Sequence, residues 1–169
     1  AQGSPRQVSL RQAEEIVAAA PLKFVGVFRD QPAEEVAGIA SHLRLSAVQL
    51  HGSESAEFIA ALRQQLPSQI AIWKAFSISD HLPERNLPDT DRYLFDNGNG
   101  GSGQRFDWSL LQGQDLHNVM LAGGLNAENC AEAALTGCAG LDFNSGVETA
   151  PGIKDPKKLA DVFRQLRAY

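Results

Sequence analysis

Short apolar runs alternate with longer amphipathic stretches along this chain. The runs are four to six residues long and almost continuously apolar, which is typical of strands buried on both faces of a parallel sheet. An antiparallel sheet with one wet face would alternate more regularly between apolar and polar residues. The pattern predicts strands at Phe24–Phe28, Ala47–Leu50, Ile70–Ala75, Arg92–Asp96, Val119–Ala122 and Gly140–Phe143.

The stretches between the runs have the 3.6-residue apolar period of helices, and polar residues mark where they begin. Pro32, followed by two glutamates, opens one predicted helix, and Asp155 with Pro156 opens the last. Asn126 is the expected cap of a helix through Cys130. A first helix with Leu10 on its apolar face therefore precedes a β-α unit repeated about six times. This alternation predicts an α/β fold with a parallel sheet and outer helices.

Two architectures agree with the alternation, an open doubly wound sheet and a closed barrel. The 169 residues suit a single domain over 1–169. The pattern starts with a loop and a helix, so a barrel of about 250 residues, at about 28 residues per unit, would need two more strands before Ala1.

Composition narrows the choice of partners. A formal net charge of −5 gives no basic surface for nucleic acid or an anionic membrane. No apolar run approaches the ~18 residues of a spanning helix, and residues 1–5 do not resemble a signal peptide. Two cysteines do not suggest a disulfide scaffold, so we expect a cytoplasmic protein.

Candidate chemistry lies where the predicted strands end, because ligands of parallel α/β folds bind at the carboxyl ends of strands. Asp96 closes an apolar strand, where partial burial would raise its pKa and suit it to donate a proton. A cap or an ion-pair partner is an equally good interpretation. Gly123-Gly124 and Ser145-Gly146 follow the last two strands and could offer backbone N–H groups to a phosphate, or could be ordinary turn glycines.

The remaining polar residues could have structural roles as readily as functional ones. His51 could line a site or be a structural histidine, and Lys74 could reach the site or pair with a neighbouring acid. The position of Arg6 in the sequence, considered alone, indicates only an ordinary surface arginine. The glycine-rich stretch Asn97–Gly103 matches neither a P-loop nor a dinucleotide motif and is interpreted as a lid or a long loop. No spacing resembles a metal site, and nothing basic beside Cys130 or Cys138 in the sequence indicates a nucleophile.

Several motifs occur in one order along essentially the whole chain. They are Ser4-Pro5-Arg6, Val25–Phe28, Ala47–Gly52, Gly100–Gly103, Phe106–Trp108, Leu121–Leu125 and Asp142–Glu148 with Pro151-Gly152. As an ordered set they resemble the phosphoribosylanthranilate isomerase family of tryptophan biosynthesis. The ending Leu166–Tyr169 is similar to the isomerase half of bifunctional enzymes that carry indole-glycerol-phosphate synthase at their N-terminal end. The resemblance implies a fused synthase domain upstream.

The resemblance implies a (β/α)8 TIM barrel from which strand 1, helix 1 and strand 2 are missing. It implies an Amadori rearrangement of N-(5-phosphoribosyl)anthranilate to 1-(2-carboxyphenylamino)-1-deoxyribulose 5-phosphate, without metal or cofactor. An acid opens the ribose ring and a base removes the C2 proton. Carried over by motif, Asp96 is the acid and Arg6 binds the anthranilate carboxylate. The same motifs assign phosphate binding to Gly123, Gly124, Ser145 and Gly146, and the lining of the pocket to Gln49, His51 and Asp142.

One part of the family pattern is absent from these residues. The family's base is a cysteine in a Lys-x-Cys-Gly stretch at the end of strand one, and neither cysteine of this chain occupies that place. We therefore expect this chain by itself to bind phosphorylated ligand weakly and to turn over little. Two alternatives stay open, a non-catalytic phosphate-binding or interaction module with an open six-stranded sheet, and another sugar-phosphate barrel enzyme.

Overall fold

The computed structural model describes residues 3–97 and 105–167, in two compact units. Unit 1 comprises Ala1–Ala75 and Asn86–Arg92, and unit 2 comprises Phe76–Arg85 and Tyr93–Tyr169. Residues 98–103 of the predicted lid lie outside the described part of the chain, so the structure does not test that prediction.

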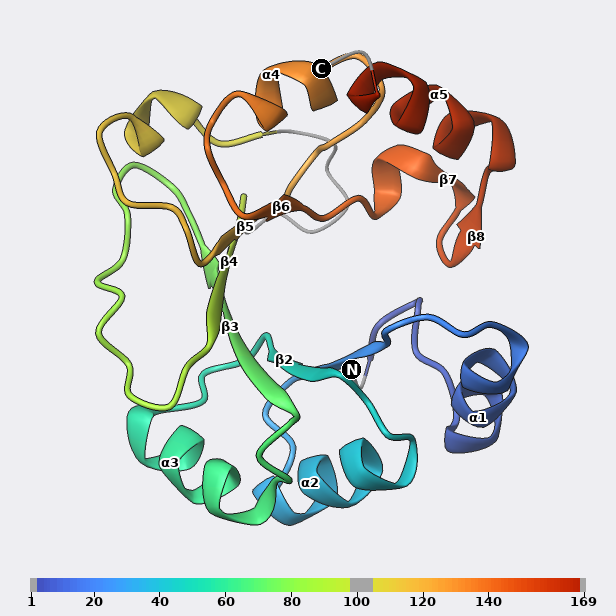
Figure 1. The fold of residues 1–169 in the computed structure, drawn as a ribbon, viewed down its shortest axis with the longest axis vertical. Coiled ribbons are helices and arrows are strands. Elements are labelled where there is room, and N and C mark those ends of the chain that lie inside the picture. The colour runs from blue at the N-terminus through green and yellow to red at the C-terminus, as the bar shows by residue number, and fades with distance from the viewer. Residues whose placement is uncertain (1–2, 98–104, 168–169) are drawn as a thin grey trace. The chain divides into compact units, whose positions relative to one another are not determined.

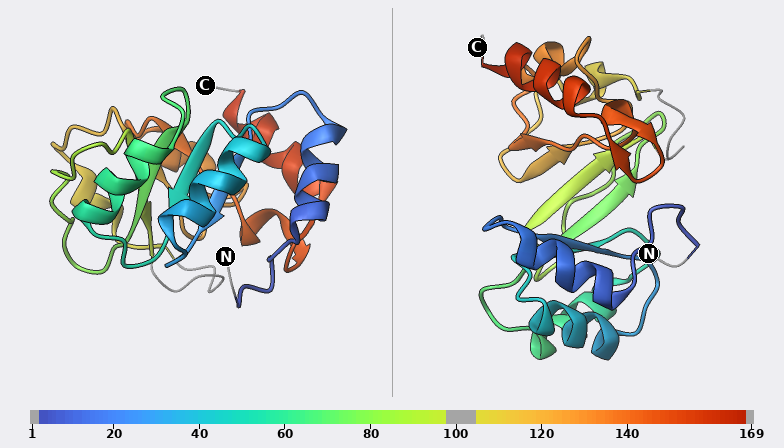
Figure 2. Two further views of the ribbon diagram at one scale, coloured as in Figure 1. Left: turned by 90° about the horizontal axis from the view of Figure 1, so that it is seen from below. Right: turned by 90° about the vertical axis from the view of Figure 1, so that its right-hand side faces the viewer.

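Unit 1 begins with a helix and continues with alternating strands and helices (Figure 1). Strands β1, β2 and β3 pair in parallel, in the order of the sequence. The two helices that follow β1 and β2 pack side by side (Figure 2). The elements are α1 (Leu10–Ala19), β1 (Val25–Phe28), α2 (Ala33–His42), β2 (Ala47–Leu50), α3 (Ala56–Gln65) and β3 (Ala71–Ser77), whose last two residues belong to unit 2.

Local chemistry explains where the helices of unit 1 begin. Ser9 forms a capping box with Gln12, and the Ser55 hydroxyl accepts a hydrogen bond from the Phe58 backbone N–H at 3.3 Å. The apolar faces of α2 and α3 then pack on the strands, with Val36 and Ile59 fully buried. In contrast, α1 has no buried residue, although its predicted apolar period is present.

Unit 2 contains a second set of three parallel strands, β4, β5 and β6, again paired in sequence order. Its last two helices pack together around buried Cys130, Val147 and Val162. A short antiparallel hairpin, β7 with β8, comes before the final helix. The elements are β4 (Arg92–Asp96), η1 (Trp108–Leu111), β5 (Val119–Leu121), α4 (Cys130–Ala134), β6 (Gly140–Leu141), η2 (Ser145–Val147), β7 (Glu148–Ala150), β8 (Ile153–Lys154) and α5 (Pro156–Leu166).

All six predicted strands are present, but a helix does not follow each of them. Residues 78–91 after β3 contain no helix, because this stretch lacks a helical apolar period and includes Pro83 and Pro88. In the described residues between β4 and β5 there is only the 3-10 turn η1. Asn126 caps the turn that leads into α4, since its side chain accepts from the backbone N–H groups of Glu128 and Asn129 and its carbonyl accepts from the Cys130 N–H. The helix itself begins at Cys130, directly after Asn129, whose side chain makes no cap hydrogen bond to α4.

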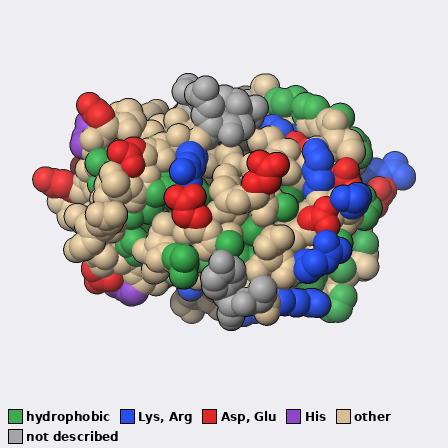
Figure 3. Space-filling model, turned by 90° about the horizontal axis from the view of Figure 1, so that it is seen from above, with side chains coloured by type: hydrophobic (Ala, Val, Ile, Leu, Met, Phe, Trp, Pro, Cys, Tyr) green, Lys and Arg blue, Asp and Glu red, His purple; other side chains and the backbone are tan. Residues whose placement is uncertain are grey.

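The surface carries charged side chains of both signs. On the face shown in Figure 3, acidic and basic side chains lie intermingled and do not separate by sign. No helix within the described ranges combines the length and apolarity needed to cross a membrane.

Candidate functional site

Three of the predicted site residues lie at one edge of the strands of unit 2. The ladder continues past the strand ends, since the Ala122 N–H donates to the Phe95 carbonyl and the Asp142 N–H donates to the Leu121 carbonyl, both at 2.8 Å. Asp96, Gly123 and Asp142 therefore follow three neighbouring strands at their carboxyl ends, where ligands bind in parallel folds.

Two partly buried carboxyl groups define the electrostatics of this edge. Asp96 Oδ1 accepts a hydrogen bond from the Asn97 backbone N–H at 2.7 Å. The pKa of Asp142 is raised above its ordinary value, first by burial and then by the negative charge of Asp96, and the Lys154 ammonium only partly offsets these effects. A buried carboxyl group whose pKa is raised beside a second acid is a feature of proton-transfer sites. Sequence reasoning assigned the raised pKa to Asp96 and did not anticipate it at Asp142.

The glycines after β5 and β6 allow the loops of unit 2 to lie very close together. Gly123 and Gly124 adopt φ angles of 86° and 68°, which favour glycine. The Gly124 carbonyl accepts from the Asn129 side chain at 3.0 Å, which ties this loop to the start of α4. A Cβ on Gly146 would overlap the Leu125 carbonyl oxygen of the neighbouring loop. Packing therefore excludes a side chain at Gly123 and Gly146, and the backbone conformation favours glycine at Gly124, whatever these residues bind.

The three remaining predicted residues lie in unit 1. Gln49 is buried in β2, and its side-chain amide lies 2.8 Å from Nε2 of His51, just beyond the strand. This contact fixes the orientation of the imidazole ring. Arg6 lies in the opening loop and lines a cavity of about 630 Å³ that is bounded by α1, β1 and the loop after β1. Unit 1 thus has polar groups of its own at the carboxyl end of β2 and in the opening loop.

Unit 1 contains a buried ion pair, of which the sequence analysis named Lys74 but not its partner Glu54. Lys74 Nζ lies 2.8 Å from Glu54 Oε2, and the two side chains are 5% and 2% exposed. Glu54 also accepts backbone hydrogen bonds from Asp30 at 3.0 Å and from Gly52 at 2.9 Å, while Lys74 donates to the Gly52 carbonyl. The pair therefore joins the loops after β1 and β2 to strand β3. Of the two interpretations of Lys74, pairing with an acid is the one observed. Glu54 was missed, although it lies three residues after His51 at a strand end.

Asp30 completes this loop arrangement. Its Oδ1 accepts from the Ser53 backbone N–H at 2.7 Å and from the Ser53 hydroxyl at 2.9 Å. These hydrogen bonds, backbone first, lower the pKa of Asp30 below its ordinary value. Asp30 therefore acts as an anionic turn anchor at the end of β1.

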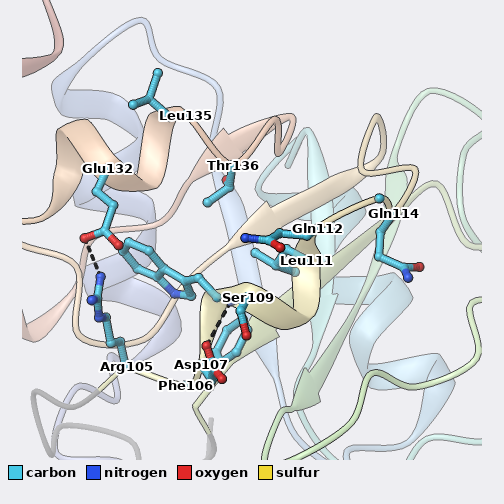
Figure 4. Close-up of a pocket in the computed structure, with 12 residues that line it drawn as sticks. Arg105, Phe106, Asp107, Ser109, Leu111, Gln112, Gln114, Glu132, Leu135 and Thr136 are labelled. Carbon is cyan, nitrogen blue, oxygen red and sulfur yellow. Dashed lines mark hydrogen bonds and ion pairs between the residues drawn. The ribbon is translucent and has the colours of Figure 1, made fainter.

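A separate pocket of about 820 Å³ lies between η1 and α4 (Figure 4). Arg105 forms an ion pair with Glu132 at 2.5 Å, and its guanidinium lies 4.5 Å from the centre of the Trp108 ring. None of the nine predicted site residues lines this pocket. We therefore place the candidate site at the strand ends and not in this pocket.

Both cysteines of the chain lie within the described residues. Cys130 is buried at the start of α4, and Cys138 lies just before β6, at the amino end of that strand. Burial raises the pKa of the Cys138 thiol, which disfavours the thiolate. Within residues 3–97 and 105–167, no group of three His, Cys, Asp or Glu side chains is arranged to hold a metal ion.

The parallel β-α order, with acids and glycines at the strand ends, defines an α/β protein of the TIM-barrel type. The sequence model for N-(5'-phosphoribosyl)anthranilate (PRA) isomerase matches residues 1–165. This chain belongs to the PRA isomerase family. The family match confirms the resemblance drawn from the ordered motifs.

Solved structures of the family have the same fold. The phosphoribosyl anthranilate isomerase of Thermus thermophilus matches with a TM-score of 0.83 and 35% identity, over 99% of this chain and 84% of that one. A phosphoribosyl anthranilate isomerase solved with reduced 1-(o-carboxyphenylamino)-1-deoxyribulose 5-phosphate matches with a TM-score of 0.79 and 29% identity, over 99% and 84%. The predicted barrel-type α/β fold is confirmed, and the open doubly wound sheet is not favoured.

The curated relatives are much longer proteins. The tryptophan biosynthesis protein TrpCF of Salmonella typhi is 60% identical over 98% of this chain, and that of Yersinia pestis is 57% identical over 98%. The chain spans 37% and 35% of the length of these two proteins.

Proposed function

We propose that this chain performs the isomerase chemistry of a bifunctional tryptophan-biosynthesis enzyme, the Amadori rearrangement of N-(5-phosphoribosyl)anthranilate. The family match over residues 1–165 carries the proposal, and the carboxyl groups at the strand ends of unit 2 support it. Residues 1–169 act as one isomerase domain, in a cytoplasmic polypeptide that also contains an indole-glycerol-phosphate synthase domain. The length of the TrpCF relatives supports that second domain.

Each proposed role follows from the position of a side chain. Asp96, at the end of β4, donates the proton that opens the ribose ring to an imine. Asp142 follows β6, which is separated from β4 by β5, and its carboxyl group can form a hydrogen bond with a sugar hydroxyl. Gln49 orients His51, and both line the substrate pocket.

The two anionic ends of the substrate need different partners. Arg6 binds the anthranilate carboxylate through its planar guanidinium. Gly123, Gly124, Ser145 and Gly146 bind the phosphate through their backbone N–H groups, as the loops after late barrel strands commonly do. No metal or cofactor takes part. Neither cysteine of this chain is assigned as the base that removes the C2 proton, since Cys138 precedes β6 and Cys130 begins α4.

The test is turnover of phosphoribosylanthranilate by the full-length polypeptide. Asp96→Asn is expected to lower kcat by about a hundredfold or more, because the amide cannot supply the proton. Asp115→Asn is the matched control, since Asp115 is exposed before β5, at the amino end of that strand. An Asp96→Asn enzyme that retains most of its activity would remove Asp96 from this role. Ligand binding by the full-length wild-type protein without isomerisation would instead favour a non-catalytic binding module.

A further inference from the structure

The loop after β5 passes so close to Asp96 at Gly123 that no side chain fits at this position. A Cβ built on Gly123 would lie 2.7 Å from Asp96 Oδ1, 2.8 Å from the Asn97 backbone nitrogen and 3.2 Å from the Asn97 Cβ. Real Cβ atoms essentially never approach other atoms within 3.0 Å. The Cα of Gly123 thus packs directly against the carboxyl group of Asp96, the proposed acid.

The surroundings leave little room for this contact to relax. Asp96 Oδ1 is held by the Asn97 N–H at 2.7 Å, and the Asp96 carbonyl accepts from the Ile78 N–H at 2.7 Å. On the other side, the Ala122 N–H donates to the Phe95 carbonyl at 2.8 Å, which fixes the spacing of β4 and β5 immediately before the two loops. One of the clashing atoms belongs to the backbone, so a change of rotamer cannot remove the overlap. A side chain at position 123 would have to displace the acid or its loop.

We propose that Gly123 is a positioning residue for the isomerisation, and that its missing side chain sets where the Asp96 carboxyl group lies. This inference rests on the proposed function, in which Asp96 is the general acid. It differs from the phosphate-binding role of Gly123, because that role uses the backbone N–H and this one uses the empty space beside the Cα. Proton donation requires the acid within hydrogen-bond distance of the ring oxygen. A displacement of about 1 Å can reduce a rate by about a hundredfold.

The experiment compares Gly123→Ala with Gly137→Ala in the full-length polypeptide. Gly137 has a similar φ of 82°, has nothing within 4 Å of a built Cβ, and precedes β6 at the opposite end of the strands. Both variants therefore place an alanine at a similar positive φ, but only one crowds the acid. We expect Gly123→Ala to lower kcat by about ten- to a hundredfold and Gly137→Ala to retain the wild-type kcat.

A double-mutant cycle separates positioning from phosphate binding. If Gly123 acts through Asp96, Gly123→Ala costs little further kcat in an Asp96→Asn background. If it acts only on phosphate, KM rises, kcat is unchanged, and the effect persists in that background. The second result would overturn the inference, as would an equal loss of kcat in Gly137→Ala.

A spectroscopic measurement tests whether Gly123 sets the position of the Asp96 carboxyl group, even if the proposed function is wrong. The 13C signal of the Asp96 carboxyl, assigned by its loss in Asp96→Asn, should shift in Gly123→Ala and stay in place in Gly137→Ala. An unmoved signal would refute the positioning role, whether or not the protein isomerises its substrate. Should Gly123→Ala be too unstable to purify, shortening the acid by Asp96→Ser should restore part of the lost stability, and no recovery would also refute the role.

Discussion

Replacing Lys74 by methionine should destabilise this protein more than its chemistry at first suggests. The substitution keeps most of the side-chain volume but leaves the Glu54 carboxylate, 2% exposed, without its cation. Removing one partner of a buried ion pair costs about 3–5 kcal/mol. Because the N–H groups of Asp30 and Gly52 still donate to Glu54, we expect the lower end, about 3 kcal/mol.

Urea denaturation followed by far-UV circular dichroism measures this loss. With an m-value of about 2 kcal/mol per molar urea, the midpoint should fall by about 1.5 M. Lys157→Met is the control, because Lys157 pairs with Asp161 on the surface and is 86% exposed. A surface pair of this kind contributes less than about 1 kcal/mol. Equal midpoint shifts for the two variants would refute the conclusion that burial makes the Lys74–Glu54 pair important.

Three further predictions follow from the same structure. Folding raises the pKa of Asp142, so the ionised carboxylate destabilises the folded state at higher pH. Asp142→Asn should therefore increase the melting temperature near neutral pH, and this gain should shrink as pH falls toward 3.8. A gain that does not depend on pH would contradict this. Gly38→Ala in α2 should add about 0.5–1 kcal/mol to the free energy of unfolding in urea, because nothing lies within 4 Å of its Cβ. The 169-residue chain alone should barely turn over phosphoribosylanthranilate, because neither Cys130 nor Cys138 is placed as a base; near-normal turnover would contradict this.

The strands could be predicted from the sequence because burial on both faces leaves a continuous apolar run. Ala47–Leu50 and Arg92–Asp96 have the predicted bounds, and β6 is shorter than the apolar run that predicted it. Helix starts were predicted where a cap has a strong local signature, such as Asp155 before Pro156. Asn126 likewise accepts from the backbone N–H groups that follow it, but α4 itself begins only at Cys130, after an intervening turn.

The candidate site was predicted as a set of residue types and not as a set of contacts. The rule that ligands bind at the carboxyl ends of strands was enough to select Asp96, Asp142 and the paired glycines. It could not show that Glu54 binds Lys74, because these residues belong to different β-α units. Nor could it show that the pKa of Asp142 is raised, since burial and the distance between charges are properties of the fold.

The sequence by itself determined the α/β class, the order of the strands and the family, because apolar periodicity and motif order are local properties of the chain. Only the tertiary structure decided that Lys74 pairs with Glu54, that burial raises the pKa of Asp142, and that Gly123 must lack a side chain. Each of these depends on atoms that are about 20 or more residues apart in sequence and that meet only when parallel strands bring their carboxyl ends to the same edge of a sheet.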